Sequence, residues 1–152
     1  MAEFDLAIPI VLSNEGGLVD NPNDPGGLTK YGICKASYPD LDIKNLTVEQ
    51  ATAIYLRDFW LFGGIDSQDV ATKMLDSYVN MRHAAIKIAQ QIVGAEVDGS
   101  YGPVTEDLIN KMVPMTFLNF FRYGLAEHYK NIVVANPKEA EFLPDWLRRA
   151  AQ

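Results

Sequence analysis

The 152-residue chain has a single cysteine, Cys34, and lacks any apolar run of the roughly 18 residues that a membrane-spanning helix needs. One cysteine excludes an internal disulfide, so the fold must be stable in a reducing compartment. Residues 1–5 carry acids where a secretory signal carries bases, and Pro9 interrupts the apolar stretch that follows. We therefore expect no signal peptide, no membrane insertion and synthesis in the cytoplasm.

Basic residues are also scarce, with 13 Lys and Arg against 20 Asp and Glu and a net charge of −7. Proteins that bind nucleic acids usually gather cations to neutralise phosphates, so this balance argues against a nucleic-acid partner. It gives no attraction to an anionic cell wall either. The two histidines, His83 and His128, have no companions at metal-ligand spacing, which argues against a metal site.

What the chain does have is 48% apolar residues, enough for one domain with a sizeable core. Helical spacing of apolar residues, a Thr47–Gln50 capping box and Pro103 at a helix start predict a series of helices. Asn80 is a polar residue within the long apolar pattern of residues 67–93, so the helix expected there can break near it. The expected helices cover residues 4–15, 47–59, 67–93, 103–112, 114–134 and 137–150. Gly, Pro, Asn and Asp crowd residues 16–27, so the predicted fold is all-α with a small turn-rich or β insertion after the first helix.

Glu15 ends the first predicted helix, just before Gly16 and Gly17. It follows Val11 by four residues and Leu12 by three, so it extends the apolar stripe of that helix. Burial on this stripe and the negative end of the helix dipole both disfavour the carboxylate. This is the environment that a general acid in glycoside hydrolysis needs.

Asp24 lies in the turn-rich loop, where polar neighbours and backbone N–H groups favour an ionised carboxylate. Eight residues separate it from Glu15 and four separate it from Thr29, which is compatible with three groups around one water. Asp24 is then the base, with Asp20 as the rival. The alternative is that Glu15 is an exposed helix end and Asp24 a turn former.

Nearly the whole chain resembles glycoside hydrolase family 108, a family of N-acetylmuramidases found in phage endolysins and bacterial genomes. The resemblance rests on Glu15-Gly16-Gly17, residues 21–27, residues 29–33, residues 42–47 with the helix that follows, and residues 76–80. Residues 98–105 resemble the segment often described as the peptidoglycan-binding part of the family. We therefore expect a lysozyme-like unit over residues 1–152, with a catalytic part at 1–93 and a peptidoglycan-binding-like helical part at 94–152.

In this family the glutamate of the Glu-Gly-Gly run is taken as the proton donor, which implies that role for Glu15. The spacing of Glu15, Asp24 and Thr29 is also similar, within one residue, to the triad of T-even phage lysozymes. There the Asp and Thr hold the attacking water and the anomeric centre is inverted. The chain departs from the family at Met81-Arg82-His83, where a small Gly-containing turn is common.

Three further residues are candidates for substrate binding. Tyr31 can stack on a sugar ring or pack in the core. Asn80 interrupts an apolar helix, so its amide needs a partner, either a glycan N-acetyl group or neighbouring backbone. Tyr101 is a candidate through the resemblance alone, because residues 98–103 are sufficiently explained as a turn and a helix start. The basic end at Arg148 and Arg149 can meet a membrane or pack on the core.

Together these features predict a cofactor-independent, monomeric lysozyme that cuts the β-1,4 bond between N-acetylmuramic acid and N-acetylglucosamine in peptidoglycan glycan strands. The resemblance implies an endolysin role in cell-wall lysis, with release through a holin as one route to the wall. Competing functions are a lytic transglycosylase, which uses one glutamate, a hydrolase of chitin-type glycans, and a non-catalytic peptidoglycan-binding or secretion-accessory protein.

Overall fold

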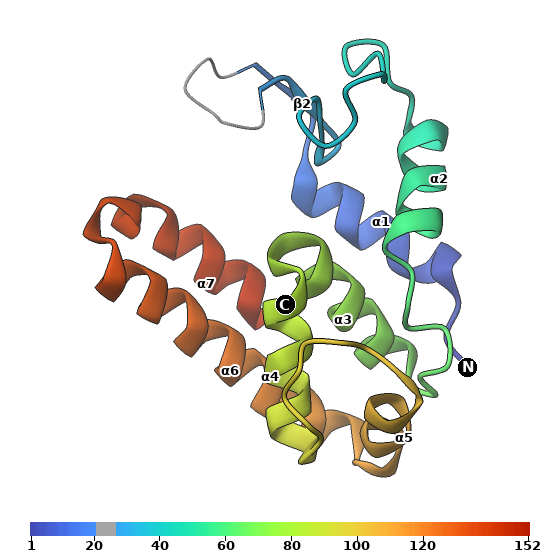
Figure 1. Ribbon diagram of the computed structural model, residues 1–152, viewed down its shortest axis with the longest axis vertical. Coiled ribbons are helices and arrows are strands. Elements are labelled where there is room, and N and C mark those ends of the chain that lie inside the picture. Colours follow the sequence, from blue (N-terminus) through green and yellow to red (C-terminus); the bar gives the residue numbers. More distant parts are fainter. Residues whose placement is uncertain (21–26) are drawn as a thin grey trace.

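The computed structural model describes residues 1–20 and 27–152 and has a mainly helical architecture, as the sequence predicted. Seven α-helices lie in the described residues, with a small sheet after the first (Figure 1). The helices are α1 (Phe4–Glu15), α2 (Val48–Asp58), α3 (Gln68–Met81), α4 (His83–Val93), α5 (Pro103–Lys111), α6 (Pro114–Ala135) and α7 (Leu143–Ala151), with a 3-10 helix η1 (Pro137–Phe142) before α7.

The predicted insertion is a three-stranded antiparallel sheet in the order β1-β2-β3. Its strands are β1 (Leu18–Val19), β2 (Thr29–Lys30) and β3 (Ile33–Cys34). Leu18 pairs with Lys30, and Lys30 pairs in turn with Ile33 across the tight turn at residues 31–32. The sheet lies beyond the C-terminal end of α1, at the opposite end of the molecule from α5 (Figure 1).

Helix α3 passes through the middle of the molecule and packs against α1, α4 and α6 (Figure 1). Nine consecutive residues, 70–78, are buried, so the prediction of a central buried helix is confirmed. The long helical pattern over 67–93 breaks at Arg82, close to the expected break at Asn80. Two charged residues, Lys73 and Asp76, lie among the buried ones.

Local signals explain most helix ends. The Thr47 hydroxyl accepts the Gln50 N–H and the Gln50 side chain accepts the Thr47 N–H, which completes the predicted capping box of α2. Pro103 and Pro114 begin α5 and α6, where a missing N–H costs nothing. Pro9 lies inside α1, beyond its first turn, where the helix forgoes one backbone hydrogen bond.

The prediction of one helix over 137–150 is wrong in its first half, where the chain forms η1 and only then α7. Pro144 supplies the reason, because it has no N–H to donate back along an α-helix that began earlier. Proline is tolerated in the first turn, so the α-helix starts afresh at Leu143.

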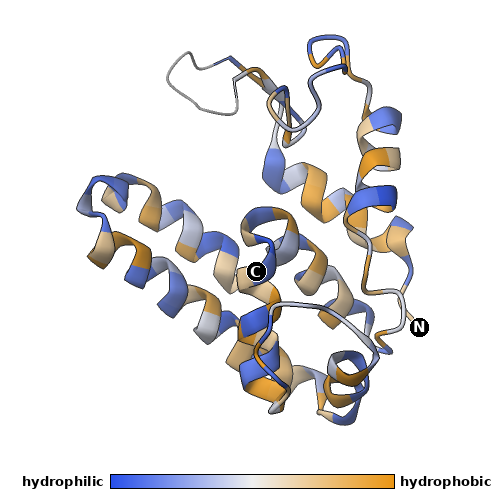
Figure 2. Ribbon diagram, viewed as in Figure 1, coloured by the Kyte–Doolittle hydropathy of each residue, from blue (hydrophilic) through white to orange (hydrophobic). Residues whose placement is uncertain are grey.

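Hydrophobic and hydrophilic residues are interleaved along every helix (Figure 2). In the described part of the chain, no helix combines the length and the hydropathy needed to cross a bilayer.

Candidate active site around Glu15

Glu15 is the last residue of α1, and Gly16 ends the helix with a positive φ of 75°. The side chain of Glu15 is 18% exposed. The carboxyl group is therefore largely enclosed by protein but still reachable from solvent, as a group that meets a substrate must be.

The turn between β2 and β3 covers the carboxylate of Glu15. Gly32 has φ of 77°, and a Cβ atom placed on it would lie 2.6 Å from Glu15 Oε2. The backbone here needs glycine for both conformation and space. Tyr55 Oη, which lies against the same face of Gly32, donates a hydrogen bond of 2.8 Å to the carbonyl of Tyr31. Burial and the nearby charge of Glu15 raise the pKa of Tyr55, so its hydroxyl remains a donor.

Arg149 on α7 meets Glu15 from the other side. Its Nη2 donates to Glu15 Oε1 at 2.6 Å. The same guanidinium donates hydrogen bonds of 2.8 Å and 3.1 Å to the two carboxylate oxygens of Asp76. The side chains of Arg149 and Asp76 are only 16% and 4% exposed. Burial opposes the charge of Arg149, but the hydrogen bonds and charges of Asp76 and Glu15 outweigh it and raise the pKa of the guanidinium.

This pairing corrects the expected surroundings of Glu15. The sequence placed its carboxyl among apolar side chains, whereas its neighbours in the structure include a guanidinium and a tyrosine hydroxyl. The reason is long-range: Arg149 is 134 residues away in the chain and needs acidic partners at a buried position.

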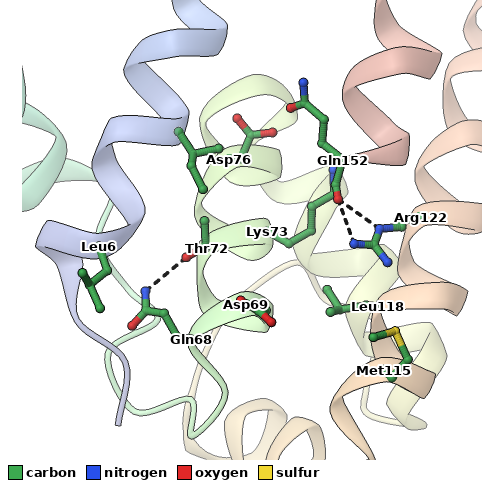
Figure 3. A pocket seen from close by; sticks show the side chains of 11 residues that line it. Leu6, Gln68, Asp69, Thr72, Lys73, Asp76, Met115, Leu118, Arg122 and Gln152 are labelled. Atoms are coloured by element: carbon green, nitrogen blue, oxygen red, sulfur yellow. Dashed lines mark hydrogen bonds between the residues drawn. The ribbon is translucent and has the colours of Figure 1, made fainter.

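The end of α7 that carries Arg149 is fastened by two cations. Lys73 Nζ donates to the Arg149 carbonyl at 2.7 Å, and Arg122 donates to the Gln152 carbonyl at 2.8 Å and 3.1 Å. Figure 3 shows both side chains pointing toward Gln152. Cations on the last carbonyls of a helix complement its dipole. They hold Arg149 in place above Glu15.

Two pockets flank this cluster. The one in Figure 3, of about 290 Å³, joins apolar side chains of α1 and α6 to the polar face of α3 and does not include Glu15. The other, of about 380 Å³, lies beside the Arg149 ion pair and is lined by Asn14, Asn80, Asp145, Trp146, Arg148, Arg149 and Gln152. We favour the second for a glycan, because it adjoins the partner of Glu15 and is rich in polar groups.

Comparisons with known proteins agree with a hydrolase site. The family model described as glycosyl hydrolase 108 matches residues 8–81, which include Glu15, the sheet, α2 and α3. The match spans just under half of the chain, and it supports a glycoside hydrolase of family 108 at the level of the family. The structure of Brucella abortus SagA is similar over 97% of this chain and 92% of that chain, with 28% identity and a TM-score of 0.75. No curated protein matches the sequence significantly.

The other candidates for the catalytic set are Thr29, Asp24 and Asp20. Thr29 begins β2, is half-buried, and its hydroxyl donates to the Gly27 carbonyl at 3.2 Å. Asp24 lies outside the described residues. Asp20, the rival base, directly follows β1 and is exposed.

The three candidate substrate residues occupy different places. Tyr31 forms the turn over Glu15, half-buried, with Lys30 Nζ 5.4 Å from its ring centre. Asn80 lines the polar pocket, where its amide donates to Tyr129 Oη. Tyr101 packs its ring edge-on against Phe62 at 4.9 Å and donates to Glu106, so none of these contacts brings it to Glu15.

Sequence reasoning missed Arg149, Asp76, Tyr55 and Gly32 as parts of the site. One signal was available: Asp76 is a charged residue in a helix whose pattern predicted burial, and a buried charge needs a partner. For Arg149 the sequence alone suggests only membrane contact or packing on the core. Among residues 1–20 and 27–152, no group of three or more His, Cys, Asp or Glu side chains is arranged to hold a metal ion.

Proposed function

We propose that the chain is an N-acetylmuramidase that hydrolyses the β-1,4 bond between N-acetylmuramic acid and N-acetylglucosamine, and that it acts as an endolysin in cell-wall lysis. The observation that carries this proposal is the position of Glu15, partly exposed beneath the β2–β3 turn and beside a polar pocket. The family match over residues 8–81 supports the reaction class.

Glu15 is the general acid in this proposal. Glu15 and Asp76 share one guanidinium, so the cluster carries a net charge of −1 when both acids are ionised. One proton on Glu15 neutralises the cluster, while Asp76 keeps its bidentate bond to Arg149. Oε1 of Glu15 is used by Arg149, so Oε2 is the oxygen from which the proton passes to the glycosidic oxygen.

Asp24 is the proposed base and Thr29 helps to hold the attacking water, which gives inversion at the anomeric centre. Asp20 is the alternative base. The anomeric configuration of the first product, followed by NMR, tests inversion. A loss of activity in Asp20→Asn that Asp24→Asn does not share would show that the base is Asp20.

The remaining assignments concern binding. Tyr31, Asn80 and Tyr101 contact the glycan in this proposal. Tyr31 lies in the turn over Glu15, and Asn80 lines the pocket beside Arg149. Residues 94–152 form the peptidoglycan-binding part. They also contribute to the catalytic neighbourhood, because Arg149 belongs to them.

The decisive experiment digests purified peptidoglycan and identifies the product ends by mass spectrometry. We expect reducing ends from the wild type and a loss of about 100-fold or more in Glu15→Gln. Glu141→Gln, an exposed glutamate on η1, is the matched control and should keep full activity. Anhydro ends would identify a lytic transglycosylase instead, and full activity of Glu15→Gln would refute the role of Glu15.

A further inference from the structure

Only two non-glycine residues in the described chain have a left-handed backbone, Tyr31 and Arg82, each with φ of 52°. Such strain in large side chains concentrates at functional sites. The two residues lie on different sides of Tyr55, which lies against the turn over Glu15. The Tyr31 carbonyl accepts the hydrogen bond of the Tyr55 hydroxyl, and the guanidinium of Arg82 stacks on Phe59, whose ring packs edge-on against that of Tyr55 at 5.0 Å. Both strained residues are therefore linked to the proposed active site through Tyr55.

Arg82 occupies the junction between α3 and α4, where its N–H closes α3 on the Tyr78 carbonyl at 2.9 Å. Its guanidinium lies 3.9 Å from the ring centre of Phe59 and 5.7 Å from that of Tyr78. Two buried rings thus hold the planar face of the group, while the residue as a whole is exposed. The edge of the guanidinium, which carries its donors, is left for solvent or a ligand.

Arg82 also differs from the other four arginines of the chain in having no acceptor among the described residues. Arg57 pairs with Asp58, Arg122 binds the Gln152 carbonyl, Arg148 pairs with Asp145 and Arg149 pairs with Glu15 and Asp76. A fixed guanidinium with unused donors is suited to a carboxylate, which it can bind through two parallel hydrogen bonds.

We propose that Arg82 binds a carboxylate of the peptide side chains on the glycan, and so selects peptide-bearing strands over bare ones. This inference rests on the proposed function, because it places the substrate across Glu15 and Tyr55. The net charge of −7 disfavours approach of an anionic polymer, so one unpaired cation beside the site has a strong influence on orientation.

The test measures binding of labelled soluble glycan strands in a Glu15→Gln background, so that no strand is cut. Strands with stem peptides are compared with the same strands after an amidase has removed the peptides. We expect Arg82→Gln to weaken binding of peptide-bearing strands about tenfold at low salt, through loss of a charge-assisted contact, and binding of bare strands less than twofold. Arg57→Gln, which removes an exposed arginine already paired with Asp58, should change neither more than twofold.

A second variant separates recognition from folding. Arg82→Gly removes both the side chain and the backbone strain, so it should lose the peptide-dependent binding as Arg82→Gln does. If Arg82 only covers Phe59 and Tyr78, the variants will lower Tm and affect both kinds of strand equally. Equal weakening, no weakening, or no binding of peptide-bearing strands by the background protein would each overturn the proposal. Selective binding by a wild type that releases no products would instead refute the proposed reaction and leave this recognition intact.

Discussion

The C-terminal ends of α1 and α7 meet at one ion pair, but their charges are opposite. Helix α7 has Arg148 and Arg149 in its last turn, and Lys73 adds a cation on its carbonyls. Helix α1 ends on Glu15 and has no basic residue in its last turn. The negative end of a helix favours cations and disfavours acids. Helix stability therefore explains the end of α7 and leaves the acid at the end of α1 unexplained.

The C-terminal ends of α1 and α7 therefore have different roles. The end of α7 is a brace, with its dipole complemented and its guanidinium bonded to buried Asp76. The end of α1 carries the reactive group, which the brace and the β2–β3 turn hold from two sides. Substitutions at the brace should mainly reduce stability, whereas substitutions at the turn should affect Glu15 and hence activity as well.

Arg149→Met should have the largest effect on stability. It leaves Asp76 buried without its cation, and breaking a buried pair in this way costs about 3–5 kcal/mol. Arg148→Met is the matched control, because its pair with Asp145 is exposed and should contribute less than about 1 kcal/mol. Urea unfolding of both variants measures the difference. Equal losses would mean that α7 is not a brace.

Gly32→Ala should have the next largest effect on stability, and it should act at the C-terminal end of α1. The positive φ and the clash with Glu15 together should cost about 2–3 kcal/mol, and hydrolysis should fall because the carboxyl is displaced. Gly17 has ordinary φ and open space where a Cβ would lie, with no atom within 4 Å, so Gly17→Ala should change stability by less than about 1 kcal/mol. Thermal unfolding and a turbidity assay on cell walls report the two effects. An active Gly32→Ala would argue that the turn does not position Glu15.

Lys73 allows the brace to be examined by pH. Burial lowers the pKa of Lys73 from 10.5 to about 8. Between pH 8 and 10.5 the unfolded chain binds a proton on Lys73 that the folded chain does not bind. The free energy of unfolding therefore rises with pH in this range, and the destabilisation by the buried ammonium is fully present below pH 8. Lys73 is only 6% exposed but lines the pocket of Figure 3, which lowers the cost of burying its charge, so we expect a rise on the order of 1–2 kcal/mol.

Lys73→Met should abolish this rise, whereas exposed Lys138→Met should retain it. The measurement is the free energy of unfolding of the three proteins from pH 7 to 11. Parallel curves for wild type and Lys73→Met would show that the ammonium is not buried in solution.

The sequence predicted what local interactions determine. The Thr47–Gln50 capping box, Pro103 and the Gly16 helix end act within one turn, and all three appear where expected. The partners of Glu15 follow from packing instead. Asp76 and Arg149 lie 73 residues apart in the chain, and no local pattern connects them. The position of Glu15 at a helix end was predictable, but its polar surroundings were not.

Tyr55→Phe should have the smallest effect on stability of these substitutions. It tests whether the β2–β3 turn positions Glu15. It removes one hydroxyl that donates to the Tyr31 carbonyl, a loss of about 1 kcal/mol. Because that hydroxyl also fixes the strained turn above Glu15, activity should fall more than stability alone explains. Tyr123→Phe, at an exposed position, should leave both unchanged. If Tyr55→Phe instead keeps full activity while losing stability, the turn is held by the backbone of Gly32 alone, and the support of the α1 end is simpler than that of the α7 end.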